Sequence, residues 1–239
     1  MDIGIKKETQ LYLPIKAFFE ELGYKVNAEV KDCDVVATKD DKVLIIELKQ
    51  NFNISLLYQA LDRQKMSGNV YIAIFHPKKD SILKKSVYIA EKLGLGFIAV
   101  DFEREFMPVE VLACPNIDSK IDKKRTSSLL KEIDQRFFEV NIAGVSGSVK
   151  KMTAYKEKAI KIACALDLAK ESSPKHLICS YKCSKDTQKI LNSDYYNWFD
   201  KVKRGVYCLS NNGKNFLNGK EYSDIINFYK DKIRGNDNV

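Results

Sequence analysis

The stretch DVVATKDDKVLIIELK, residues 34–49, decides the fold of the first half of this chain. Residues 43–46 are a short apolar run rich in β-branched side chains, which is typical of a buried strand. Residues 34–38 read as a second strand, and the polar residues 39–42 between the two have the length of a hairpin turn. We therefore expect an antiparallel hairpin whose two open ends lie together.

Three polar side chains lie at that open end. Glu47 and Lys49 are two residues apart, so they point to the same face of their strand. Folding the hairpin brings Asp34 towards Glu47. Two carboxylates and a lysine at one end of a sheet suit a hard divalent cation and a phosphodiester. The alternative is that a glutamate and a lysine at this spacing occupy an ordinary exposed strand.

The remaining periodicity of the first half predicts a mixed α/β domain. We expect helices over residues 7–22, 54–65 and 81–93, and strands over 24–30, 34–38, 43–49, 70–75 and 97–100. The resulting order is α-β-β-β-α-β-α-β. Two continuous apolar strands that flank a helix indicate a mixed sheet covered by helices.

The charge of the chain is unevenly distributed. The net charge is +8, and residues 150–239 contain 18 Lys and Arg against 10 Asp and Glu, so the whole excess lies there. A neutral core domain followed by a basic module indicates a polyanionic partner, for which we expect nucleic acid and preferably duplex DNA. The alternative is a basic surface that serves only solubility.

This basic segment has the pattern of a winged helix, three helices followed by a hairpin. We expect helices over residues 153–170, 174–181 and 184–191, a hairpin over 198–209 that turns at Gly205, and helices over 211–217 and 222–233. Ser184 is the expected capping residue of the third helix. The candidate nucleic-acid contacts are Lys185 and Lys189 on that helix and Lys201, Lys203 and Arg204 on the hairpin.

Several short motifs resemble those of a known superfamily, the PD-(D/E)XK nucleases. They are Glu8-Thr9-Gln10-Leu11-Tyr12, Gly23-Tyr24-Lys25-Val26, Glu29-Val30, Asp34-Val35-Val36, Glu47-Leu48-Lys49, Gln59-Ala60-Leu61-Asp62-Arg63, Thr153-Ala154-Tyr155, Trp198-Phe199 and Arg204-Gly205-Val206-Tyr207. Over nearly the full chain, the sequence is similar to a bacterial family of unknown function described as PD-(D/E)XK-type phosphodiesterases. The resemblance implies a restriction-endonuclease-like α/β fold followed by a winged-helix-like region. Cys33 replaces the proline that names the superfamily, but the aspartate, not the proline, binds metal.

The same resemblance implies a role for each motif residue. Asp34 and Glu47 would be ligands of Mg²⁺ or Mn²⁺, with the Leu48 carbonyl as a third ligand. Lys49 would position the attacking water or stabilise charge on the phosphate. Glu8 on the first helix would complete the site, the alternative being that it opposes the positive end of the helix dipole.

Two further candidates lie one turn apart on the second helix. Gln59 is expected to reach phosphate or a metal-bound water, and its alternative is an ordinary helix-surface amide. Arg63 is expected to contact nucleic acid, and its alternative is an ion pair with a nearby acid. Because they are four residues apart, both side chains lie on one helix face.

These observations predict a domain order and a cellular context. We expect a nuclease-like domain over residues 1–115, a connecting segment over 116–150 with an exposed polar tract at 118–126 and a flexible junction at 144–148, and a nucleic-acid-binding domain over 151–239. No apolar run approaches the ~18 residues of a membrane helix, and the first seven residues have no apolar signal core. The six cysteines have no Cys-x-x-Cys spacing. We therefore expect a cytoplasmic protein with reduced thiols and no membrane partner.

The function that these expectations favour is hydrolysis of phosphodiester bonds, most simply in DNA, by a metal-activated water. One alternative is a DNA-binding protein or regulator whose nuclease-like core has no turnover. Another is a subunit of a restriction or defence complex that acts only with partners. A second copy of the chain is a further candidate partner.

Overall fold

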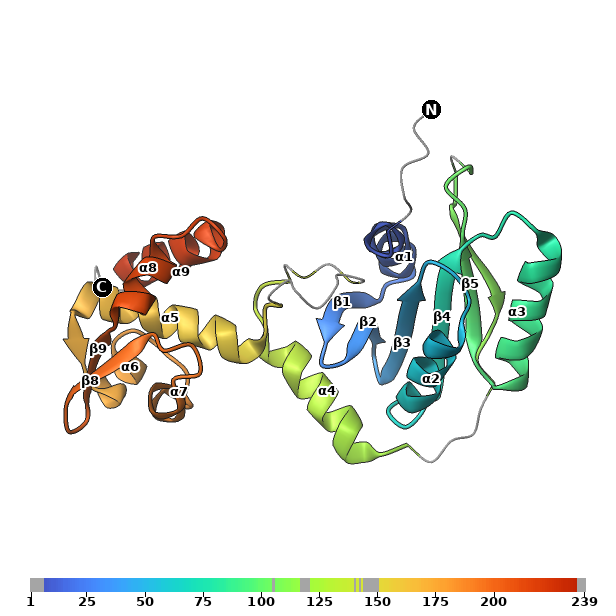
Figure 1. Cartoon of the computed structure of the whole chain (residues 1–239). Helices are drawn as coiled ribbons and strands as arrows, with labels where there is room; N and C mark the ends of the chain where they lie inside the picture. Colours follow the sequence, from blue (N-terminus) through green and yellow to red (C-terminus); the bar gives the residue numbers. More distant parts are fainter. Residues whose placement is uncertain are drawn as a thin grey trace. The chain divides into compact units, whose positions relative to one another are not determined.

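The computed structural model describes residues 7–104, 106–116, 121–139, 141, 143 and 151–235. The chain divides into two compact units (Figure 1). Unit 1 comprises Met1–Gln135 and Glu139–Met152, and unit 2 comprises Arg136–Phe138 and Thr153–Val239. The junction expected at residues 144–148 lies outside the described residues.

Unit 1 is built on a six-stranded mixed sheet in the order β1-β2-β3-β4-β5-β6. The strands are β1 (Lys25–Val30), β2 (Cys33–Lys39), β3 (Lys42–Lys49), β4 (Asn69–Phe75), β5 (Gly96–Val100) and β6 (Val109–Ala113). Strands β3, β4 and β5 are parallel, whereas β1, β2 and β6 each pair antiparallel with their neighbours. The expected mixed sheet is therefore confirmed, and β6 is a strand that the sequence analysis did not predict.

Helices cover both faces of this sheet. They are α1 (Thr9–Glu21), α2 (Ile54–Arg63), α3 (Asp80–Lys92) and α4 (Lys123–Gln135). Leu11 and Ile15 of α1 share a core with Ile46 and Leu48 of β3. Ile45, which points to the opposite face, shares a second core that includes side chains of α2, α3 and α4. A two-sided core explains why the central strands are apolar throughout.

The segment between residues 116 and 150 has more structure than a simple connection. The polar tract at 118–126 lies outside the described residues over its first part and leads into α4 over its last part. Leu129 and Ile133 of α4 are buried in the core of unit 1. They are four residues apart, so one apolar stripe is enough to dock an otherwise polar helix.

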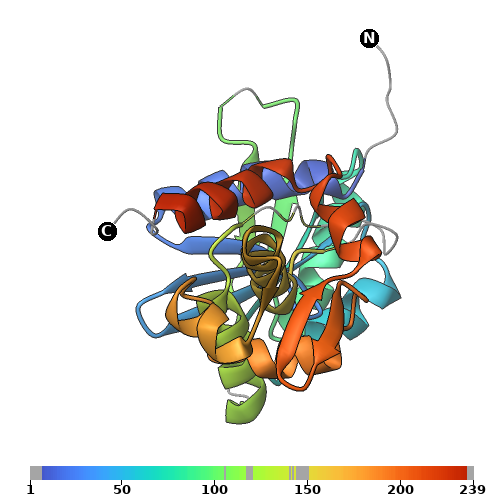
Figure 2. The same ribbon diagram turned by 90° about the vertical axis from the view of Figure 1, so that its left-hand side faces the viewer.

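Unit 2 contains five helices and a small antiparallel sheet within its described residues (Figure 2). The elements are α5 (Ala154–Ala169), β7 (Glu171–Ser172), α6 (Pro174–Cys179), α7 (Thr187–Ser193), β8 (Phe199–Lys203), β9 (Val206–Leu209), α8 (Asn211–Leu217) and α9 (Ser223–Gly235). The sheet order is β7-β9-β8, and the β8–β9 hairpin, orange in Figure 2, turns at Gly205 with a φ of 76°. None of the described helices has both the length and the apolar character needed to cross a membrane.

One expected helix start is corrected by the structure. Helix α7 begins at Thr187, whose hydroxyl donates to the Ser184 carbonyl at 2.6 Å, so Ser184 does not cap this helix. Helix α2 is capped by Asn53, whose side chain accepts the Leu56 amide N–H at 2.9 Å. The N-cap position of α7 is Asp186, two residues after the expected one.

Candidate active site

The β2–β3 hairpin brings the two candidate metal ligands together. Val35 pairs with Ile46, so Asp34, one residue earlier, lies opposite Glu47, one residue later. The Asp34 carboxylate also accepts the backbone N–H of Leu48 at 2.9 Å, which fixes one of its oxygens. This contact uses the Leu48 amide and leaves its proposed role as a carbonyl ligand a prediction.

Glu47 is fully buried, at 0% exposure. Its Oε1 accepts a hydrogen bond from Arg63 Nε at 2.8 Å. Its Oε2 has no hydrogen-bond partner among the described residues. A buried carboxylate oxygen without a partner is costly unless a ligand or a proton occupies it.

The two facing carboxyls favour shared protonation in the metal-free protein. Burial, and after it the negative charge of Asp34, raises the pKa of Glu47 to about 8, although Arg63 acts in the opposite direction. Burial also raises the pKa of Asp34, and the Leu48 N–H opposes that shift. The pair therefore holds a proton near neutral pH that a divalent cation would displace.

A third carboxylate, which the sequence analysis gave no role, lies next to this pair. Glu29 is in the same row of the sheet, because Ala28 pairs with Val35 and Val30 pairs with Cys33. Its side chain is buried and forms an ion pair with Lys151, and its charge contributes to the raised pKa of Asp34. Glu29 adopts a φ of 52°, a conformation that costs free energy for a residue with a side chain. In the sequence, Glu29 was one of the motif residues of the resemblance, but no role followed from it.

Lys49 and Glu8 meet although they are 41 residues apart in the chain. Lys49 Nζ lies 3.1 Å from Glu8 Oε2, and both side chains are 24% exposed. Glu8 is the residue at the N-terminus of α1, but its side chain makes no capping hydrogen bond there. Its carboxylate is thus directed to Lys49, at the open end of the hairpin.

Helix α2 places Gln59 and Arg63 against the sheet. Gln59 Oε1 is buried and has no hydrogen-bond partner among the described residues. Arg63 is 7% exposed and pairs with Glu47, so the structure shows the ion-pair alternative. The expected contact of Arg63 with nucleic acid stays a prediction.

The donor set of this site fits a hard divalent cation with water ligands. No three or more His, Cys, Asp or Glu side chains gather as metal ligands within the described part of the chain. Asp34 and Glu47 thus supply two carboxylates, one with a free buried oxygen. Mg²⁺ commonly binds through one or two carboxylates and keeps several waters, so two carboxylates are sufficient for it.

The five candidate nucleic-acid contacts of unit 2 are all exposed. Lys189 is on α7, whereas Lys185 lies in the turn before that helix and not on it. Lys201 and Lys203 are on β8, and Arg204 is in the turn of the hairpin. We call these five residues the basic set of unit 2.

Comparison with known protein families gives a match to part of the chain. Residues 98–216 match the family described as "Putative PD-(D/E)XK phosphodiesterase (DUF2161)". The matched segment runs from β5 to α8, and Asp34, Glu47 and Lys49 precede it. No curated protein and no solved structure matches the chain. The matched family is the one that the motifs of this chain resemble.

Proposed function

We propose that this protein is a divalent-metal-dependent nuclease that hydrolyses DNA at the Asp34–Glu47 site of unit 1. The observation that carries the proposal is the buried Glu47 carboxylate facing Asp34, with one oxygen lacking a partner. The match of residues 98–216 to a phosphodiesterase family supports the reaction class. The metal dependence and the DNA substrate rest on the donor set and on the basic charge of the chain.

Each residue of the site has a distinct proposed role. Asp34 and Glu47 would hold Mg²⁺ or Mn²⁺, with the Leu48 carbonyl as a further ligand. When bound, the ion lowers the pKa of a water and neutralises charge on the phosphate. Lys49 donates hydrogen bonds to the phosphate, and Glu8 holds the Lys49 ammonium at the open end of the hairpin, 3.1 Å away.

Gln59 is proposed to contribute through its side-chain amide. Its carbonyl oxygen is buried without a hydrogen-bond partner among the described residues, as Glu47 Oε2 is. An amide oxygen of this kind accepts a hydrogen bond from water. We propose that Gln59 binds a water of the catalytic site.

We propose that unit 2 is a winged-helix-like domain that binds duplex DNA. Support comes from three consecutive helices followed by an antiparallel hairpin, with a small strand after the first helix. The basic set of unit 2 would contact phosphates from α7, the turn before it and the hairpin. Such contacts fix orientation and carry little sequence information.

A cleavage assay tests the proposed reaction. Purified protein is incubated with plasmid, linear, branched and single-stranded DNA and with RNA, in Mg²⁺, Mn²⁺ or EDTA. We expect metal-dependent DNA cleavage by the wild type and none by Asp34→Asn. Asp41→Asn, which changes an exposed acid in the turn of the same hairpin, is the matched control and should cleave normally.

The two alternative functions give different results in this assay. A non-catalytic DNA-binding protein would bind DNA without cleaving any substrate in any metal. A defence-complex subunit would cleave only after its partner proteins are added. Full activity of Asp34→Asn would show that the reaction occurs elsewhere in the chain.

A further inference from the structure

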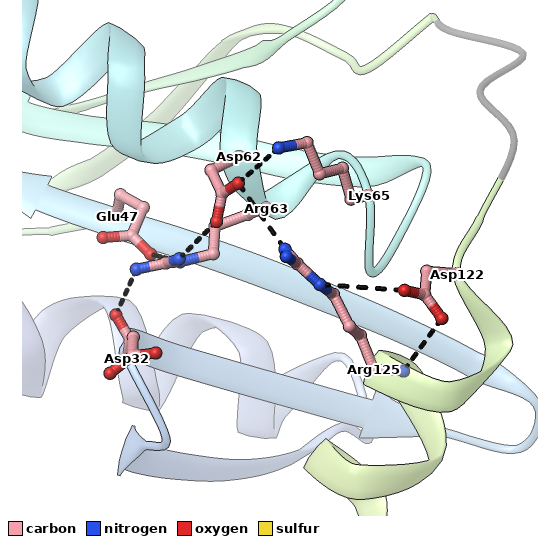
Figure 3. Close-up of polar contacts among 7 residues, drawn as sticks. All are labelled: Asp32, Glu47, Asp62, Arg63, Lys65, Asp122 and Arg125. Atoms are coloured by element: carbon pink, nitrogen blue, oxygen red, sulfur yellow. Dashed lines mark hydrogen bonds and ion pairs between the residues drawn. The ribbon is translucent and has the colours of Figure 1, made fainter.

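Arg63 is held in one orientation by all three of its guanidinium nitrogens (Figure 3). Nε donates to Glu47 Oε1 at 2.8 Å, Nη2 donates to the Asp32 backbone carbonyl, and Nη1 donates to Asp62 Oδ2 at 3.2 Å. The side chain is only 9% exposed. A planar guanidinium with three separate partners has little freedom to turn.

The two carboxylate oxygens of Glu47 therefore differ in their hydrogen bonding. Arg63 occupies Oε1, while Oε2 has no partner among the described residues. The terminal torsion of a glutamate is intrinsically broad, so a carboxylate held at neither oxygen would rotate. The ion pair with Arg63 removes that freedom and keeps the other oxygen available.

We propose that Arg63 is a positioning residue for Glu47: it fixes the carboxylate through Oε1 so that Oε2 is left to bind the divalent ion. This inference rests on the proposed metal site. In this proposal Arg63 affects metal binding through Glu47 and does not contact nucleic acid directly. Partners that orient metal ligands typically contribute about 10- to 100-fold in metal affinity.

The outer side of Arg63 belongs to a more exposed network. Asp62 also contacts Lys65 at 2.7 Å and Arg125 at 3.5 Å, and Arg125 reaches Asp122 at 3.7 Å (Figure 3). These four side chains are between 40% and 60% exposed, so water and salt screen their interactions. Asp62→Asn therefore weakens one contact of Arg63 without touching its pairing with Glu47, which makes it a matched control.

The test is a double-mutant cycle on metal affinity. Calorimetry measures Mn²⁺ binding to the wild type, Arg63→Lys, Arg63→Met, Glu47→Gln, the double variant Glu47→Gln/Arg63→Met, and Asp62→Asn. We expect Arg63→Lys and Arg63→Met to bind Mn²⁺ at least about tenfold more weakly than the wild type. Asp62→Asn should stay within about threefold of the wild type.

The cycle separates positioning from general damage to the fold. If Arg63 acts through Glu47, Arg63→Met has little further effect on Mn²⁺ affinity once Glu47 is glutamine. Arg63→Lys keeps a cation at the site, and the double variant has no buried carboxylate at position 47, so two variants remain informative if Arg63→Met fails to fold. Circular dichroism at the titration temperature checks that each variant is folded.

Cleavage kinetics distinguish the proposal from a direct phosphate contact. In Arg63→Lys we expect the Mn²⁺ concentration for half-maximal rate to rise while the KM for DNA stays near the wild-type value. A raised KM for DNA with unchanged Mn²⁺ affinity would overturn the inference in favour of a phosphate contact. Equal losses of Mn²⁺ affinity on Arg63→Met with and without Glu47→Gln would overturn it as well.

Failure of the underlying function gives a different pattern. If the wild type binds neither Mn²⁺ nor Mg²⁺, the proposed metal site is refuted, and this inference with it. If the wild type binds Mn²⁺, Glu47→Gln binds it more weakly and both Arg63 variants bind normally, the metal site stands and only the role of Arg63 is refuted.

Discussion

Replacing Arg63 by methionine should destabilise unit 1 by an amount that depends on pH. Arg63 supplies the ion pair of Glu47, a carboxyl with 0% exposure. Removing one partner of a buried ion pair leaves an uncompensated charge and costs about 3–5 kcal/mol. Methionine keeps most of the apolar stem, so little of this cost comes from lost packing.

The protonation state of Glu47 determines at which pH the full loss of unfolding free energy is expected. The pKa of Glu47 is raised to about 8 in the metal-free protein, so the carboxylate is mainly ionised only above that pH. At about pH 9 we therefore expect the whole 3–5 kcal/mol loss. At about pH 6 the neutral acid loses only a hydrogen-bond partner, which costs about 1–3 kcal/mol.

The position of the single tryptophan allows the loss of stability in Arg63→Met to be assigned to one unit. Trp198 is buried in unit 2, so its fluorescence reports the unfolding of that unit. Urea unfolding in EDTA, followed by far-ultraviolet circular dichroism and by fluorescence, should show the loss in the circular dichroism transition of unit 1. The fluorescence transition should remain in place.

Two results would refute this reasoning. One is a loss below about 1 kcal/mol at about pH 9, which would mean that Glu47 does not depend on Arg63 for its charge. The other is an equal loss for Arg63→Met and for the double variant Glu47→Met/Arg63→Met. An apolar replacement of both partners should be close to neutral, because no buried charge remains.

Three further outcomes are expected. Asp34→Ala should abolish hydrolysis and Mg²⁺ binding, whereas Lys49→Ala should lower turnover and leave Mg²⁺ affinity in calorimetry near the wild-type value, because an ammonium is not a metal ligand. Folding raises the pKa of Glu47 from 4.5 to about 8, so between these pH values Glu47 keeps a proton in the folded protein that the unfolded chain releases. The free energy of unfolding of the metal-free protein should therefore fall as pH rises through this window. Urea titrations across that range should show a flatter dependence for Glu47→Gln, and an unchanged slope would contradict the shift. Neutralising the basic set of unit 2 should weaken binding of the full chain to many duplex sequences alike and flatten the log–log salt slope by up to about 4–5 in anisotropy titrations; an unchanged slope would mean that DNA binds another face.

The amino-acid sequence by itself determined the hairpin at the centre of the site. Residues 34–49 contain both strands and their turn, so alternation and turn length are enough to set which residues face one another. The opposition of Asp34 and Glu47 follows from this local register, and the structure shows it. Most helices of both units were predictable for a similar reason, since an apolar stripe and its end signals lie within each segment. Helix α4 was not predicted, because only Leu129 and Ile133 mark its buried face.

Contacts between distant segments were decided only by the tertiary structure. Glu8 reaches Lys49 because α1 crosses the sheet with its N-terminus at the open end of the hairpin, and Arg63 turns inward because of how α2 packs on β3 and β4. The sequence of α2 allows Arg63 either to face water or to pair with an acid. An unpaired Glu47 carboxylate in the core would be costly, so the ion pair with Arg63 is favoured. This cost arises only in the folded domain, because Glu47 becomes buried only once the whole sheet and its helices have assembled.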